Sequence, residues 1–278
     1  MNESQRRAYA ALGIGPAWRM RREESPGDES PDGPPAAGNT AAMEQSVEPA
    51  SGRPAVPAER PAQPVEPPAG GAPSRAASIA AMDWAALRAS VEQCEACALS
   101  ATRHRTVFGV GDPHAGWMLI GEAPGAEEDR RGEPFVGNAG RLLDAMLAAL
   151  GLERGRGVFI ANTLKCRPPN NRDPSPEELR CCAPYLQRQI TLVEPRVIVA
   201  LGRIAAQALL QTEASIASLR GRVHAYRLGE RSIPLVVTYH PAYLLRSLHD
   251  KGRAWADLCL ARTVHDGHAG DPERAKGP

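Results

Sequence analysis

Three polar side chains stand directly after apolar runs of the sequence. Glu122 follows residues 117–120, Asn162 follows residues 158–161, and His240 follows residues 234–239. A carboxylate can carry out acid–base chemistry, an amide offers both a donor and an acceptor, and an imidazole can stabilise developing negative charge. Each residue alone also has a structural explanation: a surface acid, a turn former and a hydrogen-bonded histidine. Together they predict a ligand site at one edge of a sheet.

The loop that carries Glu122 has the features of a site for a flat ligand. Gly121 and Gly125 flank this residue closely in the sequence, and glycine allows a backbone to approach a ligand. Phe135, farther along the loop, could stack on that ligand. Ligands of open α/β sheets bind at the carboxyl ends of the strands. The acidic residues 127–129 of the same loop have no role that the sequence explains.

The cysteines have a spacing that suits a metal ion or a cluster. Cys94 and Cys97 form a C-x2-C pair, and Cys166 follows after 68 intervening residues. A further cysteine follows in a predicted helix, where Cys181 and Cys182 are adjacent. A C-x2-C pair is found in tetrahedral zinc sites and in iron–sulfur sites. The spacing therefore leaves three alternatives: unrelated core cysteines, a zinc site or an iron–sulfur cluster.

From about residue 81 onward, apolar runs alternate with helical patterns. Strands are predicted at residues 117–120, 158–161, 196–201 and 234–239, and helices from residue 84 and over residues 140–150, 175–192 and 204–210. The helix start at Ser175 is well marked, because a capping serine is followed by Pro176 and then by Glu178. The alternation predicts an α/β domain with a mostly parallel sheet.

The N-terminal part of the chain has a different composition. Residues 23–80 hold 12 of the 26 prolines, and no aromatic residue stands between Trp18 and Trp84. Such a segment cannot bury enough apolar surface to offset its ordering entropy, so we expect a disordered linker. It would separate a peptide at residues 1–22 from a domain at residues 81–265, with a flexible tail at 266–278.

Composition sets few limits on partners. The formal net charge of +1 neither favours nor excludes a nucleic acid. No apolar run reaches the roughly 18 residues that a membrane helix needs, and the N-terminus lacks the apolar core of a signal peptide. We therefore expect a cytoplasmic protein. We further predict a monomer in a bacterial cell, which composition does not determine.

Three ordered motifs resemble the family 4 uracil-DNA glycosylases, the iron–sulfur type of the uracil-DNA glycosylase superfamily. They are Gly-Glu-Ala-Pro-Gly with Pro-Phe-Val-Gly downstream, Asn-Thr-Leu-Lys-Cys-Arg-Pro-Pro, and His-Pro-Ala-Tyr-Leu-Leu-Arg. The resemblance covers about residues 81–265 and implies a three-layer α/β/α fold with a central four-stranded parallel sheet. It also implies a [4Fe-4S] cluster on Cys94, Cys97, Cys166 and Cys182. Cys182 is preferred to Cys181 because the family's fourth ligand precedes x-Pro-Tyr-Leu.

The resemblance further implies an activity, the release of uracil from single- and double-stranded DNA during base excision repair, close to the nucleoid. By the same resemblance, Phe135 would stack on the flipped base, Asn162 would form hydrogen bonds with its edge, and Gly121 would supply a backbone contact. His240 would donate a hydrogen bond to the O2 atom of the base, and Glu122 would position or activate water. The expected DNA contacts are Leu244, Leu245, Arg246, Arg167 and Arg172. Two alternatives stay open: a glycosylase for other deaminated or mismatched bases, and a non-catalytic iron–sulfur protein that binds nucleic acid.

The peptide at residues 7–22 combines apolar side chains with an arginine cluster. It resembles the N-terminal peptide by which the psi subunit of the bacterial replicative polymerase attaches to the clamp loader. This resemblance implies a contact between the chain and the replication machinery.

Overall fold

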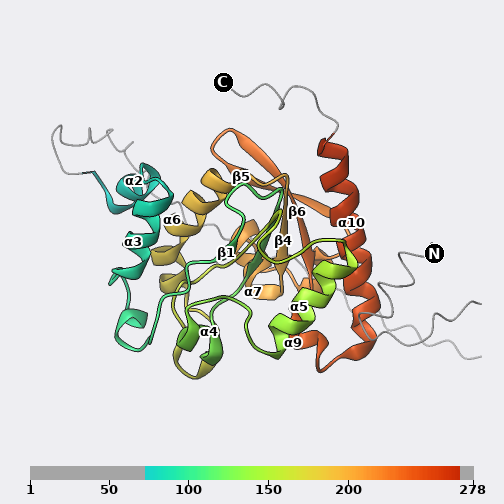
Figure 1. Cartoon of the computed structure of the whole chain (residues 1–278), viewed down its shortest axis with the longest axis horizontal. Coiled ribbons are helices and arrows are strands. Elements are labelled where there is room, and N and C mark those ends of the chain that lie inside the picture. Colours follow the sequence, from blue (N-terminus) through green and yellow to red (C-terminus); the bar gives the residue numbers. More distant parts are fainter. Residues whose placement is uncertain (1–72, 270–278) are drawn as a thin grey trace, which may run out of the picture. The chain divides into compact units, whose positions relative to one another are not determined.

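The computed structural model describes residues 73–269 and is built around one six-stranded sheet (Figure 1). The strands are β1 (Val110–Gly111), β2 (Trp117–Gly121), β3 (Val158–Asn162), β4 (Val197–Leu201), β5 (Val223–Leu228) and β6 (Arg231–Thr238). Their order across the sheet is β1-β3-β2-β4-β6-β5. The four central strands are parallel, as predicted, and the short β1 and the hairpin strand β5 add antiparallel edges.

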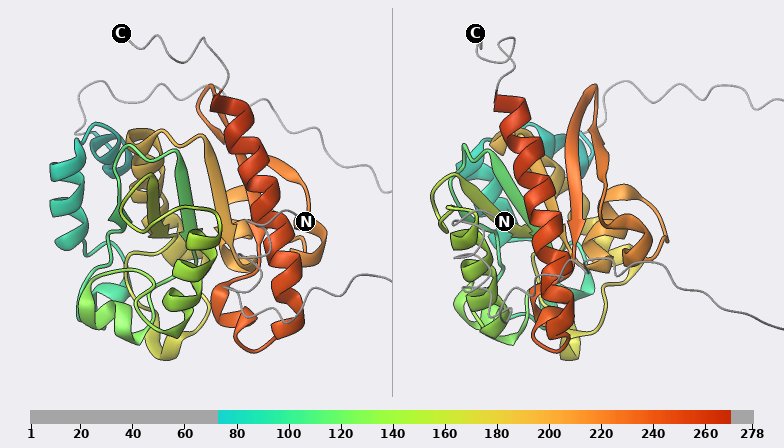
Figure 2. Two further views of the ribbon diagram at one scale, coloured as in Figure 1. Left: turned by 45° about the vertical axis from the view of Figure 1, so that its right-hand side comes forward. Right: turned by 90° about the vertical axis from the view of Figure 1, so that its right-hand side faces the viewer.

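Helices cover both faces of this sheet (Figure 2). They are α2 (Arg75–Ala80), α3 (Trp84–Glu92), α4 (Ala126–Arg131), α5 (Asn138–Ala149), α6 (Pro176–Val193), α7 (Arg203–Leu210), α8 (Ile216–Leu219), α9 (Pro241–Leu244) and α10 (Lys251–Ala269). Successive strand residues point to opposite faces: Met118 and Ile120 pack in the core with α3, α6 and α7, whereas Trp117 and Leu119 pack with α5 and α10. The α/β/α arrangement follows from this alternation.

Local sequence fixes where two helices begin. The Asp83 carboxylate accepts a hydrogen bond from the backbone N–H of Ala86 at 2.8 Å, which caps α3. At the start of α6, the N–H of Glu178 donates to the Ser175 hydroxyl at 3.2 Å, and the N–H of Ser175 donates to the Glu178 carboxylate at 2.8 Å. This capping box satisfies N–H groups that have no partner inside the helix, and it sets the start of the helix that carries Cys182.

The folded part extends beyond the predicted domain at both ends. Helix α2 lies within the residues predicted as linker, and it is held because Ile79 is only 2% exposed and packs into the core. At the other end, α10 continues to Ala269, beyond the predicted boundary. The predicted interaction peptide at residues 7–22 and most of the linker lie outside the described residues. Within residues 73–269, no helix combines the length and apolar character that a membrane span requires.

Candidate functional site

The carboxyl ends of the parallel strands bring the predicted site residues together. Gly121 at the end of β2 is the sheet neighbour of Asn162 at the end of β3. His240 follows β6 by two residues, at the same edge. Glu122, Phe135, Asn162 and His240 all line one hollow of about 620 Å³. The structure thus joins side chains that are far apart in the sequence.

Gly121 lies where no side chain has room. A Cβ atom at this position would come within 2.5 Å of Asn162 Oδ1 and 2.6 Å of Phe135 Cζ. Real Cβ atoms do not approach other atoms so closely, so any larger residue would displace one of the two side chains. Glycine is therefore needed to let the amide and the ring occupy the same end of the hollow.

Asn162 presents an unused hydrogen-bond acceptor. The residue is 2% exposed, and its Oδ1 atom has no hydrogen-bond partner within the described part of the chain. A buried polar atom left without a partner costs about 1–3 kcal/mol. Its backbone carbonyl, by contrast, accepts a hydrogen bond from Lys165 Nζ at 2.9 Å. The amide oxygen is therefore free to accept a hydrogen bond from a bound ligand.

Phe135 and His240 form a stacked pair beside this amide. Their ring centroids are 5.5 Å apart with an interplanar angle of 29°. The Nδ1 atom of His240 accepts a hydrogen bond from the N–H of Ala242 at 3.1 Å. In the neutral ring the proton is then on Nε2, which can donate. Burial lowers the pKa of His240 to about 4, assisted by the charge of Arg246, so the ring is neutral at physiological pH.

The pKa of Glu122 lies close to neutral pH. Burial, and then the negative charge of Asp173, raise its pKa to about 7, although Arg203 opposes the shift. Its backbone carbonyl accepts a hydrogen bond from the Leu164 N–H at 3.1 Å, which ties the end of β2 to the loop after β3. The carboxyl group can therefore gain or lose a proton near pH 7.

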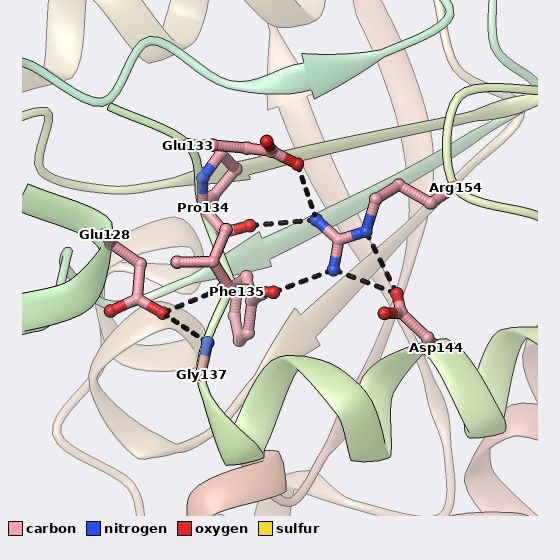
Figure 3. A network of polar contacts seen from close by, with 8 residues as sticks. Glu128, Glu133, Pro134, Phe135, Gly137, Asp144 and Arg154 are labelled. Carbon is pink, nitrogen blue, oxygen red and sulfur yellow. Dashed lines mark hydrogen bonds and ion pairs between the residues drawn. The ribbon is translucent and has the colours of Figure 1, made fainter. Parts of the chain in front are cut away.

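Two of the three acidic residues that the sequence left unexplained, Glu128 and Asp129, hold the loop after Glu122 in place. Glu128 accepts hydrogen bonds from the N–H groups of Gly125 at 3.1 Å, Val136 at 3.0 Å and Gly137 at 3.4 Å, and Figure 3 shows its contact with Gly137. Asp129 is 1% exposed and accepts from the N–H of His104 at 2.9 Å. Both carboxylates hold backbone groups that would otherwise lack partners.

Cysteine side chains line a second, largely apolar cavity between α3, the loop after β3 and α6. The cysteines are Cys94, Cys97, Cys166, Cys181 and Cys182. Three of the four predicted ligands already accept hydrogen bonds at sulfur: Cys94 from Arg75 at 3.6 Å, Cys166 from Arg103 at 3.3 Å, and Cys182 from the N–H of Lys165 at 3.3 Å. Such donors stabilise thiolates.

The five thiols share this cavity without forming a site for a single metal ion. Within residues 73–269, no three cysteine, histidine or acidic side chains are grouped so that they could hold one metal ion. A zinc site needs its sulfurs at about 2.3 Å from one centre, whereas the thiolates of a four-iron cluster bind separate irons. Cys182 and Cys97 both pack against the small apolar cluster that contains Cys166, and Cys181 lines the same cavity. Cys182 therefore stays the predicted fourth ligand on the motif alone, because the contacts do not separate it from Cys181.

A sequence model of the uracil DNA glycosylase superfamily matches residues 108–260. This span is more than half of the chain, and it includes the whole strand-end site. The chain belongs to the uracil DNA glycosylase superfamily. Two of the cysteines, Cys94 and Cys97, lie before the matched residues.

Within this superfamily, the chain is similar to type-4 uracil-DNA glycosylases. The protein from Pyrobaculum aerophilum is 43% identical over 183 residues, which cover 64% of this chain and 93% of the relative. That from Archaeoglobus fulgidus is 45% identical over 159 residues, with 56% and 79% covered. A type-5 uracil-DNA glycosylase from Thermus thermophilus is 40% identical over 155 residues, with 49% and 68% covered. The family 4 resemblance of the sequence is thus confirmed.

The superfamily motif after β6 requires one correction. Leu244, predicted to contact DNA, is the last residue of α9, and its side chain is 1% exposed and packs in the core. It therefore anchors the segment and is not available to contact a duplex. Its neighbour Leu245 is 42% exposed, and Leu248, which the sequence analysis did not select, is 61% exposed. The exposed Arg246 is held by its own turn, where it donates to the carbonyl of Ala242 at 3.0 Å.

The two other predicted DNA contacts lie at the rim of the hollow or next to it. Arg167 donates to the Asn171 side chain at 2.7 Å. Arg172 forms two hydrogen bonds with the Glu178 carboxylate, at 2.9 and 2.6 Å, and this pairing lowers the pKa of Glu178 to about 2. Much of the hydrogen-bonding capacity of Arg172 is therefore already used within the protein.

Proposed function

We propose that the chain releases uracil from single- and double-stranded DNA by hydrolysing the bond between the base and deoxyribose. The observation that supports this most strongly is the unpartnered Oδ1 atom of Asn162, buried beside the stacked rings of Phe135 and His240. A flat base with an N–H group on its edge would complete that hydrogen bond. The similarity to type-4 uracil-DNA glycosylases agrees with this ligand.

The Asn162 amide would distinguish uracil from cytosine. Its Oδ1 atom would accept from uracil N3–H, and its Nδ2 group would donate to O4. Cytosine has an amino group in place of O4 and no proton on N3, so both partners would be mismatched. A site built to hydrogen-bond its substrate rejects an analogue that leaves buried groups unpaired.

The base must leave the helical stack before it can reach the hollow. Phe135 would stack on the extruded uracil in place of its former neighbours. Leu245 would fill the space that the base vacates, because its side chain is exposed next to the hollow. Arg246, Arg167 and Arg172 would contact the phosphates, with Arg172 the weakest of the three because it is paired with Glu178.

Breaking the bond leaves negative charge on the departing base. The Nε2–H of neutral His240 would donate to uracil O2 and stabilise that charge as it develops. Glu122 would orient a water molecule toward C1′ of the sugar and accept its proton, for which a pKa of about 7 is well suited. The products would be free uracil and an abasic site.

We propose that Cys94, Cys97, Cys166 and Cys182 hold a [4Fe-4S] cluster. Its thiolate bonds would join α3, the loop after β3 and α6, and hydrolysis requires no electron from it. Asn162 stands only four residues before Cys166. The cysteine would therefore help to fix the strand end that carries the amide.

The activity can be tested with a labelled oligonucleotide that carries one uracil, as a single strand and opposite guanine. Purified iron-containing protein should make the strand alkali-labile at that position, and no cleavage should occur when thymine replaces uracil. Bases such as hypoxanthine test the alternative substrates. A protein that retains its iron and binds DNA, but leaves uracil in place, would refute the proposal.

The contact with a clamp loader through residues 7–22 stays a prediction, because that segment lies outside the described residues. Capture of the clamp loader by the full chain, and its loss in the Trp18→Ala variant, would support it.

A further inference from the structure

The backbone of Phe135 has a conformation that a bulky residue rarely adopts. Its φ angle is +55°, in the left-handed region, which non-glycine residues avoid because of contacts at Cβ. Such a conformation persists only where the surrounding structure holds it. At this position it turns the ring toward Gly121 and His240. The question is therefore which groups hold the backbone there.

Arg154 binds the backbone on both sides of this turn. Its Nη1 atom donates to the carbonyl of Pro134 at 2.9 Å, and its Nη2 atom donates to the carbonyl of Phe135 at 2.9 Å (Figure 3). In an extended chain, successive carbonyl groups point in opposite directions, so one planar guanidinium could not reach both. The two hydrogen bonds are therefore compatible with the turned backbone and incompatible with an extended one.

The arginine is itself held from its other side. Its Nε atom donates to Asp144 at 3.0 Å, and Glu133 lies 3.6 Å from Nη1. The Arg154 side chain is 20% exposed, whereas the two acids are about half exposed. A guanidinium is a rigid, planar donor that stays charged, so this pairing fixes its direction. Asp144 belongs to α5, and α5 also approaches the Phe135 carbonyl closely at Gly140.

We propose that Arg154 is a positioning residue for base recognition. It holds Phe135 in its left-handed conformation and so sets the plane on which the flipped base stacks. Arg154 does not line the hollow, and its effect on a base is therefore transmitted through the Phe135 backbone. This inference rests on the proposed uracil excision, and it adds a residue outside the sequence motifs.

The test compares the variants Arg154→Ala and Arg154→Lys with Arg156→Ala. Arg156 is an exposed arginine in the same loop. Within residues 73–269, its side chain forms no hydrogen bond or ion pair. Single-turnover uracil release would be measured together with the affinity for a duplex that carries an abasic-site analogue. Inhibition by free uracil would report on the base pocket without the DNA contacts, and millimolar guanidinium chloride would test chemical rescue of Arg154→Ala.

We expect Arg154→Ala to release uracil about tenfold more slowly, which corresponds to about 1.4 kcal/mol. Free uracil should inhibit it about tenfold less well, by the same loss of stacking, while its affinity for the abasic duplex changes less than twofold. Guanidinium should restore part of the rate. Arg154→Lys should recover little, because an ammonium cannot bridge both carbonyls in the same way, and Arg156→Ala should match the wild type.

Each other outcome points to a different failure. A rate for Arg154→Ala equal to that of Arg156→Ala would overturn the inference. An equal loss of affinity for the abasic duplex, without rescue by guanidinium, would also overturn it and would assign Arg154 to DNA binding or to general folding. If Arg154→Ala does not fold, the rate of uracil release and the abasic-duplex affinity of Arg154→Lys, compared with those of Arg156→Ala, decide whether the inference holds. Wild-type protein that releases no uracil would overturn the proposed function as well.

Discussion

Glu122 is expected to make the folded protein less stable at the pH where it is most active. Its pKa is raised from an ordinary value of 4.5 to about 7, mainly by burial. Because the folded-state pKa lies above the unfolded-state value, the folded state favours the protonated acid. The resulting stability is fully present below about pH 4.5 and is lost as the pH rises through about 7. Glu122→Gln has no carboxyl group to ionise, so it should not lose stability as the pH rises through about 7.

The magnitude follows from the size of the shift. The shift from 4.5 to about 7 corresponds to about 3.4 kcal/mol. The carboxyl group is only partly buried, and solvent screens its charge, so we expect about 1–2 kcal/mol. For a domain of this size, that raises the melting temperature by about 3–6 °C. The gain should be present at pH 8 and absent near pH 4.5.

The assay is thermal unfolding of wild type and Glu122→Gln between pH 4.5 and pH 8.5, with iron content checked at each pH. Glu127→Gln is the matched control, because Glu127 lies in the same loop but is exposed and paired with Arg130. It should show no gain that grows with pH. In parallel, the wild-type rate should rise up to about pH 7 and then level off, while Glu122→Gln should be slower by about 100-fold.

A stability difference between wild type and Glu122→Gln that is constant across this pH range would refute the reasoning, because it would not come from the ionisation of the carboxyl group. A rate profile of the wild type that is flat around pH 7 would separately remove Glu122 from the role of proton acceptor.

Three further outcomes are expected. Asn162→Asp should gain measurable excision of cytosine in a base panel and lose uracil excision, and strict specificity for uracil would count against the edge-reading role. Leu245→Ala should slow uracil release from duplexes more than from single strands, and equal effects on both DNA forms would exclude the proposed role of Leu245 in filling the space that the base vacates. Leu244→Ala should instead lower the free energy of unfolding by about 2–5 kcal/mol, as measured by denaturant titration. Cys166→Ser should lose the visible absorption of the cluster and melt at a lower temperature, and unchanged iron content would remove Cys166 from the ligand set.

Much of the fold was predictable because β2, β3 and β4 are buried along their whole length and β6 is buried over its last four residues, so each carries a run of apolar residues. The sequence of β2 and β4 could hardly form anything else. The edge strands were missed for physical reasons: β1 has only two residues, and β5 alternates between exposed and buried positions without a continuous apolar run. Helix α2 was missed because a single buried side chain, Ile79, anchors it.

Candidate site residues could be predicted where they belong to a sequence motif. They could not be predicted where only contacts in the folded structure identify them. Asn162 and His240 stand at strand ends, and their types suggest their chemistry. Arg154 stands in a loop that has no distinctive pattern, and its partners are mainly backbone carbonyls that no sequence displays. Leu244 was assigned wrongly because two adjacent leucines look alike in a motif, and only burial separates the anchor from the exposed Leu245.

The register between β2 and β3 determines which face of the sheet carries the Asn162 side chain. Gly121 and Asn162 are neighbours in the sheet although 40 residues separate them in the chain. A slip of one residue in this pairing would turn Asn162 to the opposite face. With the role proposed for Asn162, such a slip would abolish base recognition and would not merely relax its specificity, so the pairing of two strands sets the substrate of the site.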